Sequence, residues 1–132
     1  MKKTAIILIL CLCCLPGCGN NKRLGGKITF SDGKPVPYGT VLFSTPSMVA
    51  RGDIIDGTYT MGTLKARDGL PPGDYQVSVT GITRADPKNP MLFLNLCEDK
   101  YTNPNNSGLK CTVPAPGNKY DIVLEPHPKN YP

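Results

Sequence analysis

A strict alternation of apolar and polar side chains dominates the middle of this 132-residue chain. Residues 74–80 read DYQVSVT, which places Tyr75, Val77 and Val79 on one face of an extended chain and the intervening polar residues on the other. The preceding residues 68–73 read DGLPPG, and two consecutive prolines remove two backbone donors, which excludes a helix or a central strand there. We therefore expect a turn that leads into a half-buried β-strand.

The same alternation recurs along the chain, and turn residues separate its copies. Fourteen glycines and fourteen prolines, with no tryptophan, are typical of a protein made of strands and turns. The expected fold class is all-β, a seven-stranded sandwich in which two sheets bury their apolar faces against each other. Strands are expected over residues 27–31, 40–44, 49–55, 58–61, 74–80, 109–113 and 120–124.

The first eighteen residues have the order of a bacterial lipoprotein signal. Lys2 and Lys3 precede an apolar run over residues 5–15, and Leu15-Pro16-Gly17-Cys18 closes it. Lipoprotein processing needs a positive end, a short apolar stretch and a cysteine after a small residue, because that thiol takes the diacylglyceryl group. We predict a signal peptide over residues 1–17 and lipidation at Cys18. The chain would then be anchored at the bacterial cell membrane or outer membrane, facing the periplasm or the exterior.

Three other interpretations of this segment fit less well. A retained membrane helix needs about 20 apolar residues, and the run is roughly half that long. Ordinary secretory cleavage prefers small residues flanking the site, and Leu15-Pro16-Gly17 is a poor match. Cys14 could be acylated instead, but Cys13 before it is not the small residue that lipoprotein signal peptidase prefers at this position. Cys18 is therefore the predicted lipidation site.

Removal of the signal peptide leaves enough chain for one domain. We expect a tether over residues 18–25, a β-sandwich over 26–126 and a disordered tail over 127–132, whose prolines prevent strand pairing. The net charge of +5 includes the two signal-peptide lysines. The remaining charges are scattered, which gives no sign of a nucleic-acid surface. The expected partners are the membrane, through the lipid anchor, and an unknown protein or cell-wall component.

Two cysteines besides Cys18 survive processing, Cys97 and Cys111. Outside the cytoplasm such a pair is expected to form a disulfide, and two buried thiols are the alternative. Metal ligation is disfavoured because no third or fourth soft ligand lies nearby in the sequence. No metal and no cofactor are expected.

Residues 84–108 break the pattern. Prolines and asparagines with little alternation indicate a long connection, in which the apolar residues 91–96 could fold over an open end of the core. Long loops on a rigid scaffold often carry recognition. The candidate binding residues in this loop are Lys100, Tyr101 and Asn105.

Several segments resemble the carboxypeptidase regulatory-like domain, and above all small bacterial lipoproteins built from one such domain. The resemblance spans about residues 24–126 and implies a transthyretin-like, immunoglobulin-like β-sandwich. The domain that gives the family its name accompanies a peptidase and is not itself catalytic, so the resemblance implies no peptidase activity. The matching segments are GGKITFSDGKPVPYGTVLF, DGTYTMGT, DGLPPGDYQVSV, Lys100-Tyr101, Ser107-Gly108-Leu109 and YDIVLEP.

Catalytic chemistry has few candidate residues. The chain has a single histidine, His127, between two prolines in the expected tail, where nothing would hold it against a serine or a carboxylate. No zinc-binding spacing is present, and Asp32, Asp56 and Asp68 each precede a glycine in what we interpret as an ordinary turn rather than a calcium loop. We therefore expect a protein that is not an enzyme.

Two functions remain. The first is a non-catalytic binding or scaffolding module of the cell envelope, and the alternative is a carbohydrate-binding module at the cell surface. Sugar sites usually need exposed aromatic platforms. Tyr59, Tyr75 and Tyr120 are expected to face inward, which leaves only dispersed tyrosines at 38, 101 and 131.

Overall fold

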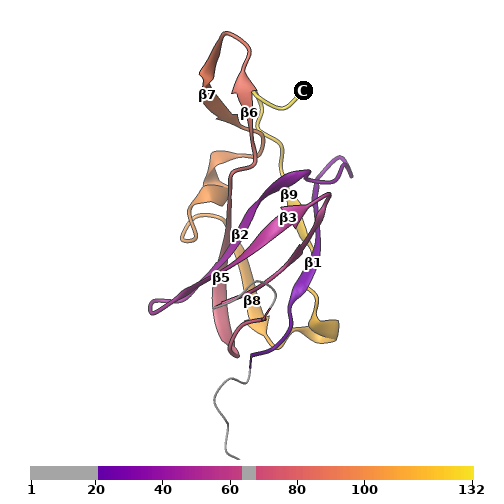
Figure 1. Ribbon diagram of the computed structural model, residues 1–132, viewed down its shortest axis with the longest axis vertical. Coiled ribbons are helices and arrows are strands. Elements are labelled where there is room, and N and C mark those ends of the chain that lie inside the picture. The colour runs from indigo at the N-terminus through magenta and orange to yellow at the C-terminus, as the bar shows by residue number, and fades with distance from the viewer. Residues whose placement is uncertain (1–20, 64–67) are drawn as a thin grey trace, which may run out of the picture.

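The computed structural model describes residues 21–63 and 68–132 and is an all-β structure (Figure 1). Cys18 and the predicted signal peptide lie outside the described residues. Within the described part of the chain no helix is long and apolar enough to span a membrane. A sheet of seven strands has the order β8-β5-β2-β3-β4-β1-β9, and its strands are β1 (Gly25–Phe30), β2 (Tyr38–Ser44), β3 (Val49–Ile55), β4 (Thr58–Thr60), β5 (Gly73–Thr80), β8 (Leu109–Val113) and β9 (Ile122–Leu124).

All seven strands expected from the alternation are present, with ends shifted by at most two residues. Two further strands, β6 (Thr83–Asp86) and β7 (Asn89–Asn95), form a separate hairpin where a long connection was expected. The described residues also form two short 3-10 helices, η2 (Asp99–Thr102) and η3 (Pro116–Asn118). The hairpin was missed because β7 reads NPMLFLN, in which apolar residues run together instead of alternating.

Strand β1 belongs to two ladders. Its first half, from Gly25 to Lys27, pairs antiparallel with β4, and its second half, from Ile28 to Phe30, pairs parallel with β9. The backbone before β9 approaches β1 so closely that a Cβ at Gly26 would collide with the carbonyl oxygen of Tyr120. Glycine is therefore required at this position of β1.

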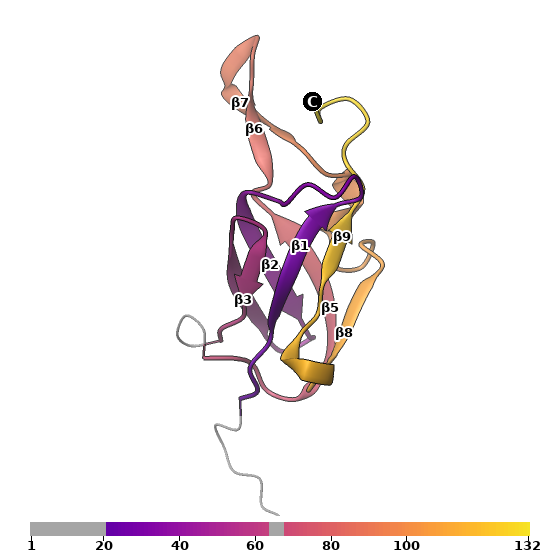
Figure 2. The same cartoon turned by 90° about the vertical axis from the view of Figure 1, so that its right-hand side faces the viewer.

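The seven-stranded sheet is strongly curled, with β8 and β9 as its two end strands (Figures 1 and 2). Phe43 on β2 and Tyr120 before β9 have ring centroids 6.1 Å apart. Strands four places apart in a flat sheet would be separated by about 19 Å. The expected sandwich of two separate sheets is thus a single hydrogen-bonded sheet that folds over its own core.

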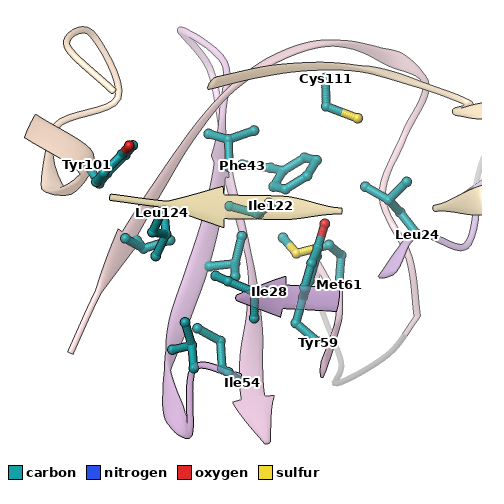
Figure 3. Close-up of a cluster of buried hydrophobic side chains, with 14 of the residues drawn as sticks. Leu24, Ile28, Phe43, Ile54, Tyr59, Met61, Tyr101, Cys111, Ile122 and Leu124 are labelled. Carbon is teal, nitrogen blue, oxygen red and sulfur yellow. The ribbon is translucent and has the colours of Figure 1, made fainter. Parts of the chain in front are cut away.

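The inside of the curl holds the hydrophobic core (Figure 3). On β5, Tyr75, Val77 and Val79 are buried as expected. Ser78 points to the other face of β5 but is also buried, because the segment after β7 covers that face and Ser107 donates its hydroxyl to the Val77 carbonyl. Fully buried residues drawn from every part of the curl include Leu24, Ile28, Phe43, Met61, Ile122 and Leu124.

The final residues, expected to form a disordered tail, are packed in the structure. The His127 backbone N–H donates to the Leu96 carbonyl at 2.7 Å. Tyr131 packs on Phe30 with ring centroids 4.6 Å apart, and its hydroxyl donates to Asp32 Oδ2 at 2.7 Å. The Lys34 backbone N–H and this hydroxyl together lower the pKa of Asp32. The prolines exclude a regular strand here but not these side-chain contacts.

Candidate functional site

The hairpin β6–β7 projects beyond one end of the curled sheet (Figures 1 and 2). It continues the line of β5 after a bend at Gly81 and Ile82. The turn at its tip is closed by Asp86, whose Oδ1 accepts a hydrogen bond of 2.9 Å from the Lys88 backbone N–H. Its pairing with the rest of the protein is confined to its base, so the outer part of the hairpin is open to solvent.

This outer part exposes three large apolar side chains. Met91 is 85% exposed, Leu92 52% and Phe93 71%. The expectation that residues 91–96 fold over the core is wrong for these three, and it holds only from Leu96, which is buried. Large exposed apolar side chains gathered in one place mark interaction sites more often than chance exposure does.

A bulge interrupts the pairing of β7 next to these residues. Ala85 pairs with Phe93 and the next residue, Asp86, pairs with Asn89, so residues 90–92 have no partner on β6. Bulges of this kind interrupt a ladder and redirect side chains. The apolar residues therefore lie just behind the polar turn at the tip.

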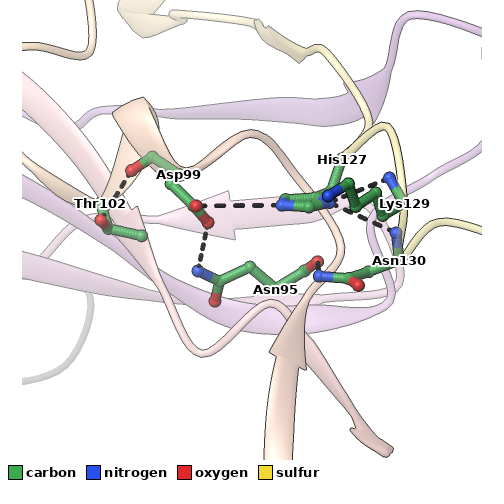
Figure 4. Close-up of polar contacts among 6 residues, drawn as sticks. All are labelled: Asn95, Asp99, Thr102, His127, Lys129 and Asn130. Atoms are coloured by element: carbon green, nitrogen blue, oxygen red, sulfur yellow. Dashed lines mark hydrogen bonds and ion pairs between the residues drawn. The ribbon is translucent and has the colours of Figure 1, made fainter.

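The base of the hairpin is tied to the sheet and to the final residues of the chain. The Tyr38 hydroxyl donates to the Thr83 carbonyl at the start of β6. Arg84 Nε donates to the Asn130 carbonyl at 2.8 Å. Asn130 Nδ2 donates to the Asn95 carbonyl at 3.0 Å (Figure 4). Both strands of the hairpin are thus held by the same terminal segment.

His127 organises this terminal segment. Its Nδ1 accepts hydrogen bonds from the backbone N–H groups of Lys129 at 3.1 Å and Asn130 at 3.3 Å (Figure 4). Its Nε2 lies 3.8 Å from Asp99 Oδ2. The side chain is only 17% exposed, so His127 is held in the structure and does not belong to a disordered tail as expected. Because its Nδ1 lone pair is occupied by backbone donors, the imidazole serves as a structural tie in this conformation rather than as a proton acceptor for a substrate.

The three residues proposed for a binding loop are not gathered into one surface. Tyr101 is buried, and its hydroxyl accepts a hydrogen bond of 3.2 Å from the Glu125 backbone N–H. Lys100 Nζ lies 3.7 Å from Glu98 Oε1 and is placed over the Tyr101 ring. Asn105 is exposed on a separate turn. Of the three candidate binding residues, Lys100 and Asn105 are thus exposed and Tyr101 is not, and a binding role for them stays a prediction.

The tyrosines do not form the exposed aromatic platform that a sugar-binding site usually needs. Tyr59 and Tyr75 are buried and Tyr120 is partly buried, as expected. Tyr131 packs on Phe30, which leaves Tyr38 as the exposed tyrosine of the described residues.

Cys97 and Cys111 are both buried free thiols, so the expected disulfide is wrong. The backbone of Cys97 forms an isolated β-bridge with Pro126, which follows β9. Cys111 lies near Tyr120, which precedes β9. Six residues of extended chain span about 20 Å. A disulfide requires Cα atoms within about 7 Å of each other. The two cysteines therefore occupy opposite ends of the core.

The described residues contain no group of three or more histidine, cysteine, aspartate or glutamate side chains placed to hold a metal ion. An open depression at the end of the sheet opposite the hairpin is lined by Arg23, Lys27, Lys119 and Asp121. Asp121 Oδ1 already accepts a hydrogen bond of 2.9 Å from the Lys27 backbone N–H. Surface lysines in an open depression do not define a ligand.

We predict that both thiols react slowly in the folded protein. Burial raises the pKa of Cys97 to about 11 and also raises the pKa of Cys111. At pH 8 about one Cys97 thiol in a thousand is then ionised, against about a quarter in the unfolded chain. Iodoacetamide followed by intact-mass spectrometry should modify both cysteines in denaturant and neither on the same timescale in buffer. A non-reduced mass two protons short of the dithiol would contradict this.

We also predict that His127→Ala loosens the hairpin base. The substitution removes the acceptor for two backbone donors and costs about 1–2 kcal/mol of unfolding free energy. Hydrogen exchange should speed up at Asn130 and at residues 94–95. Lys129→Ala is the matched control, because only its backbone N–H takes part in these contacts. Equal exchange in both variants would rule out this role for the imidazole.

Comparison with known proteins finds no match: no family model fits the chain, and no curated protein and no solved structure is similar to it at a significant level.

Proposed function

We propose that this chain is a lipid-anchored bacterial lipoprotein whose β-domain is a non-catalytic binding module of the cell envelope, and that it binds a protein partner through the hairpin β6–β7. The observation that carries the binding role is the exposure of Met91, Leu92 and Phe93 on a projecting hairpin with a fixed base. Hydrophobic side chains in contact with water cost about 25 cal/mol per Å², and a partner that covers them recovers this free energy.

The anchor rests on the sequence of residues 1–18. The geometry of the described residues is compatible with it. β1 begins at Gly25 at one end of the sheet, and the hairpin projects from the opposite end (Figure 2). A lipid on Cys18 would therefore leave the hairpin on the side away from the membrane.

The fold proposed for the domain is the transthyretin-like sandwich of the carboxypeptidase regulatory-like family. Its support is the pattern of turn and strand residues in the sequence and the curl that brings β2 and β9 to opposite sides of one core. A two-layer sandwich is the arrangement that such a curl approaches.

The hairpin favours a binding role over the two other functions considered. Catalysis by the histidine would require a free proton acceptor, and His127 Nδ1 is engaged by backbone donors. A carbohydrate platform would require several exposed aromatic rings on one face. The exposed aromatic side chains of the described residues are Tyr38 and Phe93, and Phe93 adjoins the exposed aliphatic residues Met91 and Leu92 in the chain. Apolar side chains on a projecting strand are suited to a protein surface instead.

The anchoring proposal predicts that Cys18→Ser prevents processing. Without the thiol the diacylglyceryl group cannot be attached, so the variant should keep residues 1–17 and incorporate no labelled fatty acid. Mass spectrometry of the purified protein and a fatty-acid labelling gel would show both effects. Normal cleavage and labelling of Cys18→Ser would refute the anchor.

The binding proposal predicts that Met91→Ser, Leu92→Ser and Phe93→Ser together abolish complexes that chemical crosslinking captures in intact cells. The matched control combines Val49→Ser and Val123→Ser, which remove exposed apolar side chains from other strands. Thermal unfolding should be similar for both proteins, because none of the five side chains is buried. Complexes that survive the hairpin variant, or an absence of complexes from the native chain, would refute a hairpin-mediated function.

A further inference from the structure

Three cations line the open depression at the end of the sheet where β1 begins. Arg23 precedes β1, Lys27 belongs to it and Lys119 follows η3. All three residues are exposed, and none forms an ion pair with an acidic side chain of the described residues. Asp121 is the one carboxylate among the described residues of the lining. Three positive charges and one negative charge give the lining a net charge of +2.

The chain enters the folded domain at this same end. The Lys22 backbone N–H donates to the Leu70 carbonyl at 2.8 Å, and the Leu70 N–H donates to the Lys22 carbonyl at 3.0 Å. Lys22 and its neighbour Arg23 are thereby held against the domain. Lys22 is four residues after Cys18, and an extended chain covers at most about 14 Å in four steps. A lipid on Cys18 would therefore keep these cations close to the headgroup layer.

From this placement we infer that the basic face, formed by Arg23, Lys27 and Lys119, docks on the anionic headgroups of the membrane that holds the anchor. The inference rests on the proposed lipid anchor and adds a second contact, which orients the domain on the membrane. With the basic face against the headgroups, the hairpin β6–β7 points away from the membrane (Figure 2). Each Lys or Arg near an anionic surface strengthens docking by about fivefold.

The openness of the depression favours a lipid surface over a small free anion. Its cations are exposed, so an anion bound among them would stay in contact with water, which weakens each ion pair. A membrane presents many anionic groups at once, and the anchor makes the contact intramolecular, so a few weak attractions are sufficient. Charges attract over about 8 Å at physiological salt, which a short tether can bridge.

The test measures the orientation of the full-length, acylated chain in lipid vesicles. A fluorescent dye is attached through Thr60→Cys, an exposed residue that lines the depression, or through Asn89→Cys in the turn of the hairpin. Cys97 and Cys111 are buried, so the added thiol is the reactive one. The vesicles carry a nitroxide quencher on a lipid headgroup, in phosphatidylcholine alone or in phosphatidylcholine mixed with anionic phosphatidylglycerol.

We expect phosphatidylglycerol to quench the dye at Thr60→Cys and to leave the dye at Asn89→Cys unquenched. Combining Arg23→Gln, Lys27→Gln and Lys119→Gln should lower the ratio of docked to free domain by about a hundredfold. Quenching should then return to its level in phosphatidylcholine alone. Salt at about 1 M, where the screening length is about 3 Å, should have the same effect on the native chain.

The matched control combines Lys34→Gln, Lys88→Gln and Lys129→Gln. It removes the same number of positive charges from exposed residues outside the depression, and quenching at Thr60→Cys should persist. Loss of quenching in this control as well would show that net charge, rather than the basic face, attracts the domain to the membrane. That result would refute the inference.

The remaining outcomes separate the docking from the anchor. A chain that stays with the vesicles but shows no quenching at Thr60→Cys, equal quenching at both dye positions, or quenching that the basic-face variant retains would refute the docking and leave the anchor intact. Loss of quenching in millimolar inorganic phosphate, at constant ionic strength, would assign the depression to a free anion instead. A chain that carries no acyl group and does not stay with the vesicles would refute both.

Discussion

The structure depends on the two-sided pairing of β1. Its first half continues the antiparallel meander through β4, and its second half accepts the parallel strand β9. Because β9 lies beyond β1 in the sheet, this pairing brings Ile122 and Leu124 into the same core as Phe43 on β2. Without it the sheet would have an open edge at β1 and an exposed apolar face.

The position of β9 also determines where the hairpin points. Residues 125–127 continue from β9 and pair with residues 96–98, through Glu98 to Glu125 and through His127 to Leu96. The segment after β7 is thereby fixed against the end of the sheet, and Tyr101 is buried beneath Glu125. The parallel pairing of β1 with β9 thus fixes the position of the terminal segment. The terminal segment in turn fixes the base of β6–β7.

The hairpin has two parts with different physical requirements. At its base, polar atoms of Arg84, Asn95 and Asn130 satisfy one another, and the backbone is held from both strands. In its outer part, Leu92 and Phe93 remain in water without compensation. This combination of a rigid base and exposed apolar side chains behind the polar turn is the reason that we propose the hairpin as a recognition element.

The sequence was sufficient for the strands of the main sheet, because side chains alternate wherever one face of a strand is buried. It was insufficient for β6 and β7, which have no core face to impose alternation. Tyr101 and His127 were misplaced for a related reason. Their environment is made by the pairing of residues 96–98 with 125–127, and no local pattern reveals contacts between segments so far apart. The resemblance to a known domain likewise concerned turns and strands and carried little information about the site.

The parallel ladder between β1 and β9 has a consequence for biogenesis. Ile28 on β1 can pair with Ile122 only after Ile122 has been synthesised. A nascent chain therefore cannot complete its core until nearly all of it has been made. Contacts between distant residues also form slowly compared with local ones. A polypeptide that threads through a translocation channel has to remain unfolded during transit. For the exported lipoprotein that we propose, this topology would delay folding until the chain is nearly complete.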